Sequence, residues 1–133
     1  MKTPCQLVQQ ALSQLLRPEA LDADTAAQFF SPQYQQHVDG RTLNYAEFLA
    51  HLDYLKSQVQ QMHLQILAIA SNGNTVMTHH RVDVTRHQGT TARLEVLARF
   101  ECIEGRIISC YEHSRLCDGD TQDRYLGSAM SES

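Results

Sequence analysis

The sequence predicts a single α+β domain in which N-terminal helices pack on a curved antiparallel sheet. Apolar residues recur at the spacing of a helical face in the first half of the chain, and they alternate with polar residues in the second half. Three turn signals, Asn72-Gly73, Gln88-Gly89 and Glu104-Gly105, divide the alternating part. Helices followed by strands are typical of α+β domains, whose helices gather on one face of the sheet.

Two helices are expected near the N-terminus. The first begins at a capping box formed by Thr3 and Gln6, and it ends at Arg17-Pro18 because the residue before a proline disfavours helical backbone. A shorter helix follows either Asp22 or Asp24, since both are good N-cap residues.

A third helix is expected after Asn44, which forms a second capping box with Glu47. Its apolar face continues to Val59 at helical spacing. The segment from Tyr34 to Arg41, between the second and third helices, is polar and is expected to be a loop.

Four strands joined by short turns are expected in the second half, as an antiparallel meander. Their approximate ranges are 62–70, 76–86, 91–102 and 107–116. We therefore expect one domain over residues 1–117, followed by a polar C-terminal tail over residues 118–133.

The register of the last two hairpins decides which side chains face the helices. Three-residue turns at both would pair His80 with Val96 and Val96 with Glu112, so that all three side chains point inward. A two-residue turn at Glu104-Gly105 would instead place Glu112 on the outer face with Arg99. The first register is preferred because it buries the apolar residues together. The inner face of the last strand would then carry Ile108, Cys110, Glu112, Ser114 and Leu116.

Composition excludes several classes of function. The formal net charge of -4 lacks the basic face that broad nucleic-acid binding requires. No stretch approaches the roughly 20 apolar residues that span a bilayer, and the N-terminus lacks the pattern of a signal peptide, so a cytoplasmic protein without membrane partners is expected.

No phosphate-binding glycine motif or nucleophile elbow is present, and no cofactor is expected. The cysteines form no C-x-x-C pair and are expected to be buried, reduced thiols: Cys5, Cys102, Cys110 and Cys117.

The order of elements and several segments resemble the nuclear transport factor two-like superfamily, which includes SnoaL-like polyketide cyclases, ketosteroid isomerase and scytalone dehydratase. Two of these segments are Tyr34 to His37, after the second helix, and Phe100 to Ile107, at the last hairpin. The likeness is strongest to bacterial SnoaL-like proteins with a His-Val-Asp-Gly loop, here His37 to Gly40, and a Leu-Gly-Ser tail, here Leu126 to Ser128. The resemblance covers about residues 5–117. It implies a cone-shaped domain with an apolar pocket, which is often a homodimer.

The chain departs from ketosteroid isomerase in its acidic and phenolic residues. The first helix has no tyrosine to serve as an oxyanion donor, and Asp83 is expected to point outward. The acid expected on the inner face is Glu112. Steroid isomerisation is therefore not expected, because a shared fold does not transfer function.

Three residues are candidates for catalysis. His37 could move a proton while Asp39 orients its ring, at the mouth of the cavity. Alternatively, His37 bonds to backbone and Asp39 forms a turn with Gly40. Glu112 interrupts an apolar stripe, so it is either a buried acid–base group or one half of a structural pair.

Four further residues are candidates for ligand binding. His80 lies on the inner face, where it is either a ligand contact or a satisfied core histidine. Tyr34 either donates a hydrogen bond into the pocket or packs under the loop. Phe100 and Val96 are expected to form apolar walls. Convergence of His37, His80 and Glu112 on a metal ion is conceivable, but no metal site is predicted.

Two kinds of function fit these expectations. One is a cofactor-independent acid–base enzyme, of the isomerase, cyclase or dehydratase type, that acts on a hydrophobic small molecule. The other is a non-catalytic module for ligand binding or dimerisation. The number of titratable groups that converge in an open cavity would distinguish them.

Overall fold

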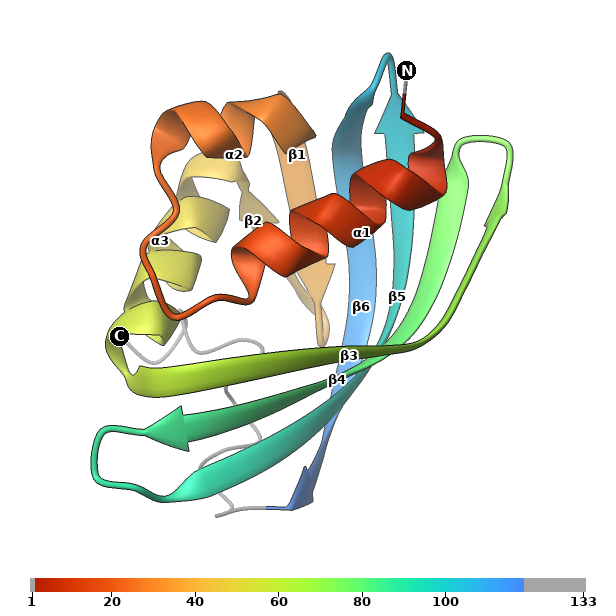
Figure 1. Cartoon of the computed structure of the whole chain (residues 1–133). Helices are drawn as coiled ribbons and strands as arrows, with labels where there is room; N and C mark the ends of the chain where they lie inside the picture. The colour runs from red at the N-terminus through yellow and green to blue at the C-terminus, as the bar shows by residue number, and fades with distance from the viewer. Residues whose placement is uncertain (1, 119–133) are drawn as a thin grey trace.

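Three helices lie on one side of a strongly curved, six-stranded sheet in the computed structural model, which describes residues 2–118 (Figure 1). The elements are α1 (Pro4–Leu15), α2 (Ala23–Phe29), β1 (Phe30–Val38), β2 (Arg41–Asn44), α3 (Tyr45–Ser57), β3 (Val59–Asn72), β4 (Thr75–Arg86), β5 (Thr91–Ile103) and β6 (Arg106–Asp118). The strand order is β2-β1-β6-β5-β4-β3. The predicted α+β class is confirmed. The predicted tail, from residue 119 onward, lies outside the residues that the structure describes.

The helices begin where the capping residues indicated. The side chain of Thr3 accepts a hydrogen bond from the backbone of Gln6, and Asn44 does the same for Glu47. In turn, the side chains of Gln6 and Glu47 accept hydrogen bonds from the backbone N–H groups of Thr3 and Asn44, which completes the two capping boxes. Asp22, rather than Asp24, caps α2.

The predicted polar loop from Tyr34 to Arg41 is wrong, because most of this segment is a β-hairpin. β1 pairs with β2 antiparallel, and on its other edge it pairs with β6 in parallel. The alternation is masked in the sequence because Gln36 takes an inward position between Tyr34 and Val38. The sheet is therefore mixed, although the meander from β3 to β6 is antiparallel as predicted.

A β-bulge lies at the point where the long strands bend. Figure 1 shows β3 and β4 running beneath the helices and then turning upward beside α1. The pairing between β3 and β4 shifts between Ile66 and Ala68, which leaves Leu67 as an extra residue in β3. Bulges increase the local bend of a strand. His80 pairs with Ile66 directly beside this bulge, and its side chain is buried in the interior.

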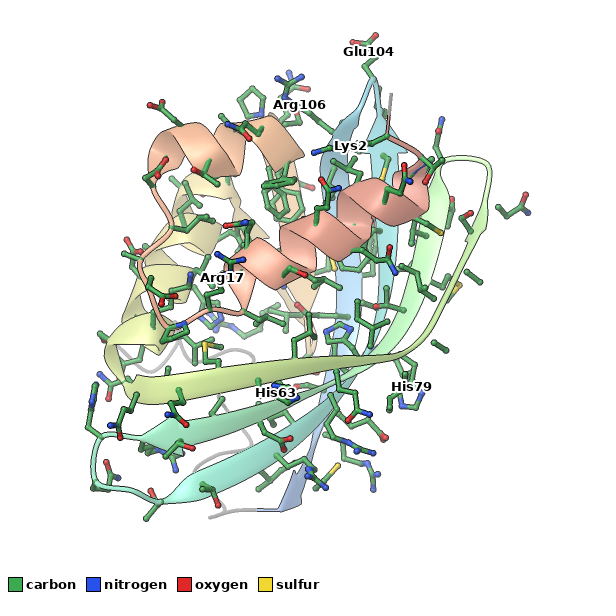
Figure 2. The ribbon with its side chains drawn as sticks, viewed as in Figure 1. Lys2, Arg17, His63, His79, Glu104 and Arg106 are labelled. Atoms are coloured by element: carbon green, nitrogen blue, oxygen red, sulfur yellow. The ribbon has the colours of Figure 1, made fainter. Side chains whose placement is uncertain are left out.

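The β5–β6 hairpin has a two-residue turn, not the predicted three-residue turn. Glu104 and Gly105 both have positive φ, at 52° and 78°, as expected for the type I′ turn that suits a tight hairpin. Figure 2 shows Glu104 at the tip. Ile103 pairs with Arg106, but beyond Cys102 the register shifts by one residue.

This shift restores the inward direction of Glu112. The extra residue is Ile108, so Glu112 pairs with Ala98, and Val96 pairs with Ser114. The predicted pairing of Val96 with Glu112 is therefore wrong by two residues, whereas the pairing of His80 with Val96 is confirmed. The predicted inward position of Ile108 is also wrong, because Ile107 is the fully buried residue at the start of β6.

The core is built around three aromatic rings. Phe30, Tyr34 and Phe48 are buried, and their ring centroids lie 4.7, 4.8 and 5.3 Å apart in pairs. These rings hold β1 against α3, since aromatic side chains bury large apolar areas. Cys102 and Cys110 are buried as predicted, whereas Cys5 is half-buried and Cys117 is exposed. Among the described residues, no helix has the length and apolar character to cross a membrane.

Candidate functional site

A cavity of about 110 Å³ lies between α1, α3 and the inner face of the sheet. Its walls are mostly aliphatic and aromatic, and five of the predicted site residues are among them: Tyr34, His80, Val96, Phe100 and Glu112. Further polar residues in its wall are Gln36, His51 and Ser114. An apolar cavity with a few convergent polar groups is the usual form of a small-molecule site.

A chain of hydrogen bonds runs along one wall of the cavity. The hydroxyl of Tyr34 donates to Oε1 of Gln36, and Nε2 of Gln36 donates to Oε1 of Glu112. Tyr34 and Gln36 point to the same face because they are two residues apart on β1. Glu112 reaches them from β6, which lies beside β1. The tyrosine therefore orients the amide, and the amide orients the carboxyl group.

The carboxyl group of Glu112 titrates close to neutral pH. Burial is the largest cause, the negative charge of Asp39 is the second, and together they raise its pKa to about 7. The hydrogen bond from Gln36 acts in the opposite direction because it favours the carboxylate. Both forms of Glu112 are therefore populated near neutral pH, as a general acid–base group requires.

Two further titratable groups near Glu112, the hydroxyl of Tyr34 and the thiol of Cys110, keep their protons. Burial raises the pKa of Tyr34 and of Cys110 well above their ordinary values, and the nearby charge of Glu112 has the same effect. Both groups are therefore neutral at physiological pH. The thiol of Cys110 is a buried neighbour of the tyrosine hydroxyl and does not supply a thiolate.

His80 is neutral in the opposite part of the wall. Its side chain is almost fully buried, and Nδ1 lies 3.0 Å from Oγ1 of Thr78. Burial, with a smaller effect of the neighbouring His79, lowers the pKa of His80 to about 4. A neutral imidazole presents one donor and one acceptor. Between β4 and β6 stands only β5, so His80 and Glu112 sit on strands roughly 10 Å apart.

His37 does not line the cavity, contrary to the expectation that it lies at the cavity mouth. Because it alternates with Gln36 and Val38 on β1, its ring is on the outer face of the sheet. There it stacks on Tyr111, and Nδ1 lies 3.0 Å from Oγ1 of Thr42.

Asp39 contacts β6 rather than His37. Together with Gly40 it forms the turn between β1 and β2, and both residues have positive φ. Its carboxylate accepts hydrogen bonds from the backbone N–H of Ser114 at 2.9 Å and from the Ser114 hydroxyl at 2.7 Å. Of the two interpretations of Asp39, the backbone therefore supports the one in which it forms a turn with Gly40 rather than orienting the ring of His37.

A family model for the SnoaL-like domain matches residues 14–110. The chain belongs to the SnoaL-like family. A relative from Schizosaccharomyces pombe, an uncharacterised protein, is 31% identical over 109 residues, which are 82% of this chain and 84% of that protein. The predicted resemblance is therefore confirmed.

Solved structures show the same fold as this SnoaL-like domain. IdmH from Streptomyces antibioticus, named as a candidate polyketide cyclase, aligns with a TM-score of 0.75 and 14% identity over 99% of this chain and 100% of IdmH. An LEH-like epoxide hydrolase from M. tuberculosis aligns with a TM-score of 0.69 and 18% identity, over 97% of this chain and 95% of that one. At these identities the likeness shows the fold alone.

Two polar residues in the cavity wall of this SnoaL-like domain escaped the sequence analysis. Gln36 was hidden by the mistaken loop, although it lies two residues from Tyr34 and would share its face in a strand. His51 lies three residues after Phe48 on α3 and is equally buried, so the spacing of the helix face did contain a signal for it.

No described group of three His, Cys, Asp or Glu side chains in the SnoaL-like domain is arranged to bind a metal ion. The set considered from the sequence does not converge, since His37 is on the opposite face of the sheet from His80 and Glu112.

Proposed function

We propose that this SnoaL-like domain is a cofactor-independent acid–base enzyme that acts on a small hydrophobic molecule, with Glu112 as the proton-transferring group. One observation carries the proposal. A carboxyl group that titrates near neutral pH ends a hydrogen-bonded chain inside an apolar cavity. Strongly shifted carboxyl groups in cavities are frequent catalytic groups.

The geometry suits the transfer of one proton to and from the substrate. The carboxylate of Glu112 removes a proton from an acidic carbon next to a carbonyl group, and the resulting carboxylic acid returns the proton to another atom of the same molecule. Gln36 holds Glu112 in place throughout. Neutral His80, across the cavity, can donate a hydrogen bond to the negative charge that develops on the carbonyl oxygen.

The size of the cavity limits the substrate. About 110 Å³ is less than the 150 Å³ of an engineered cavity that holds benzene. A larger molecule requires the helices to move. Leu12 and Leu15 of α1, with Leu16 directly after it, line the wall that would have to move. The favoured substrate is therefore a compact apolar molecule with one carbonyl group. The neighbours named for polyketide cyclisation and epoxide hydrolysis support small-molecule chemistry but name different reactions.

Proton exchange tests this proposal directly. A panel of small ketones and aldehydes is incubated with the protein in D₂O, and incorporation of deuterium beside the carbonyl group is followed by NMR. We expect Glu112→Gln to lower the exchange rate by about 100-fold or more, because general base catalysis contributes that much. His37→Ala, on the outer face, is the matched control. Equal rates for wild type and Glu112→Gln, or binding without exchange, would favour the non-catalytic binding module.

We also propose that the outer face of the sheet joins two copies of the chain. Met77, Leu97 and Tyr111 are exposed there by 56%, 59% and 42%, on three adjacent strands. They form one patch because Arg99 of β5 pairs with both Met77 and Tyr111. Exposed apolar residues gathered in this way are typical of a protein–protein contact.

A further inference from the structure

We propose that Asp39 is a positioning residue for Glu112, because its carboxylate fastens the segment of β6 that carries Glu112 and places a negative charge beside the cavity. The inference rests on the proposed function of Glu112 as the acid–base group. It gives Asp39 a role different from the orientation of His37 that the sequence indicated.

The contacts of Asp39 stand at the point where β1 stops pairing with β6. The last paired residues are Val38 and Glu112. The backbone N–H of Asp39 then donates to the carbonyl of Glu112 at 3.1 Å. The carboxylate of Asp39 takes the place of the next strand residue, since it accepts the N–H of Ser114 as well as its hydroxyl. Three hydrogen bonds thus fix β6 at the carbonyl of Glu112 and at Ser114, directly after the point where the Glu112 side chain leaves the strand.

The backbone of the turn explains why an aspartate suits this position. Asp39 has φ of 48°, in the left-handed region that most residues avoid and that aspartate and asparagine tolerate. Only aspartate also brings a charge. Asparagine would keep the backbone conformation and an oxygen acceptor but remove the charge, so the two contributions can be separated.

The charge of Asp39 acts on the titration of Glu112. It opposes ionisation of Glu112 and is second only to burial among the causes of its raised pKa. The other titratable groups that line the cavity or contact Asp39 are Tyr34, His51, His80, Cys110 and His113. Of these, Nδ1 of His113 lies 3.9 Å from Oδ1 of Asp39 and is exposed, so its protonation would offset the charge of Asp39.

A titration of Glu112 by ¹³C NMR, with the side-chain carboxyl labelled, tests the inference without any substrate. We expect Asp39→Asn to lower the pKa of Glu112 by on the order of half a unit or more, because a like charge is removed. Ser114→Ala is the matched control. It removes one hydrogen bond of Asp39 but keeps its charge, so the pKa of Glu112 should shift much less than in Asp39→Asn.

Two results would overturn the inference. One is an unchanged pKa of Glu112 in folded Asp39→Asn, and the other is an equal shift in Ser114→Ala. If Asp39→Asn does not fold, Asp39→Gly serves in its place, because glycine accepts the left-handed backbone and removes the carboxylate. Failure of the proposed function would show itself separately, as a lack of proton exchange in the wild-type protein.

Discussion

The imidazole ring of His37 lies flat on the ring of Tyr111, with their centroids 4.1 Å apart and their planes inclined by 7°. The guanidinium group of Arg99 is 4.4 Å from the centroid of the same tyrosine ring. These three side chains form a layer across β1, β6 and β5 on the face of the sheet away from the helices. Figure 2 shows His79 on the same side of the sheet. The outer face therefore has an organised polar and aromatic surface that is separate from the cavity.

The first prediction follows from this separation. His37→Ala should lower the free energy of unfolding by about 1 kcal/mol, since a stacked ring pair contributes about that much. It should leave the pKa of Glu112 and the rate of proton exchange unchanged. Urea unfolding and the NMR titration measure these quantities. A large fall in exchange rate in the folded variant would contradict this prediction and would indicate that His37 takes part in catalysis.

The second prediction concerns stability at alkaline pH. The pKa of Glu112 is raised in the folded protein, from 4.5 to about 7, so the folded state binds this proton more tightly than the unfolded state. Its contribution to stability is present below pH 4.5 and is lost as the pH rises through 7. The loss is at most about 3 kcal/mol, from about 1.4 kcal/mol for each pH unit.

Glu112→Gln should remove this dependence, because the amide has no proton to lose. We expect the variant to be more stable than wild type at pH 8 and to lose that advantage at pH 4.5. Urea unfolding across this range measures the difference. Asp83→Asn is a control, because Asp83 pairs with Arg93 on the outer face. An unchanged difference between Glu112→Gln and wild type at all pH values would contradict the raised pKa.

The third prediction concerns His80, whose contribution to stability is lost at low pH rather than at high pH. Burial lowers its pKa from 6.5 to about 4, so the unfolded chain takes up a proton before the folded protein does. The stability that neutral His80 provides is complete above pH 6.5 and is lost as the pH falls to 4, by up to about 3 kcal/mol.

His80→Asn can keep the hydrogen bond to Thr78, because an asparagine amide approximates the Nδ1 side of the ring. We expect the stability of this variant to fall less than that of wild type when the pH is lowered from 7 to 4.5. Thermal unfolding at both values provides the measurement. His87→Asn, at an exposed histidine, is the control. Equal acid sensitivity in His80→Asn and wild type would show that folding does not lower the pKa of His80.

The helices and the meander could be predicted because their signals are local. A capping box spans four residues, as at Thr3 and Asn44, and a turn signal spans two. β1 could not be recognised in this way. Its parallel partner β6 lies more than 70 residues further along the chain, and Gln36 breaks the apolar alternation.

The position of Glu112 was predicted on the correct face through two deviations that cancel. The turn at Glu104-Gly105 is one residue shorter than expected, which alone would have turned Glu112 outward. The bulge at Ile108 adds one residue and turns it inward again. A bulge has no dependable local signal, because an extra residue in a strand is stabilised by its surroundings. Gln36, the hydrogen-bond partner of Glu112, was also missed, because it lies on the unrecognised strand β1.

The fourth prediction tests the hydrogen-bonded chain. Tyr34→Phe keeps the aromatic packing with Phe30 and Phe48 but leaves Oε1 of Gln36 without its donor. We expect a loss of about 1–2 kcal/mol in stability, because a buried acceptor is left unsatisfied. Proton exchange should fall about tenfold, as a loss of 1.4 kcal/mol in transition-state stabilisation implies. Tyr111→Phe removes the same group from the outer face and should change neither quantity. An unchanged exchange rate in Tyr34→Phe would mean that Gln36 holds Glu112 without help from the tyrosine.

The last prediction concerns the outer patch. Leu97 is 59% exposed, and it pairs with His79 on one side and His113 on the other. We expect the wild-type protein to sediment as a dimer and Leu97→Lys to sediment as a monomer, because a lysine at the centre of the contact would be costly to desolvate. The stability of the monomer itself should change by less than about 0.5 kcal/mol, since the position is exposed. Ile103→Lys, at a residue near the β5–β6 turn that is 52% exposed, is the control and should remain dimeric. A wild-type protein that sediments as a monomer at high concentration would contradict the proposed contact, and dimers of equal affinity in both variants would place the contact on another surface.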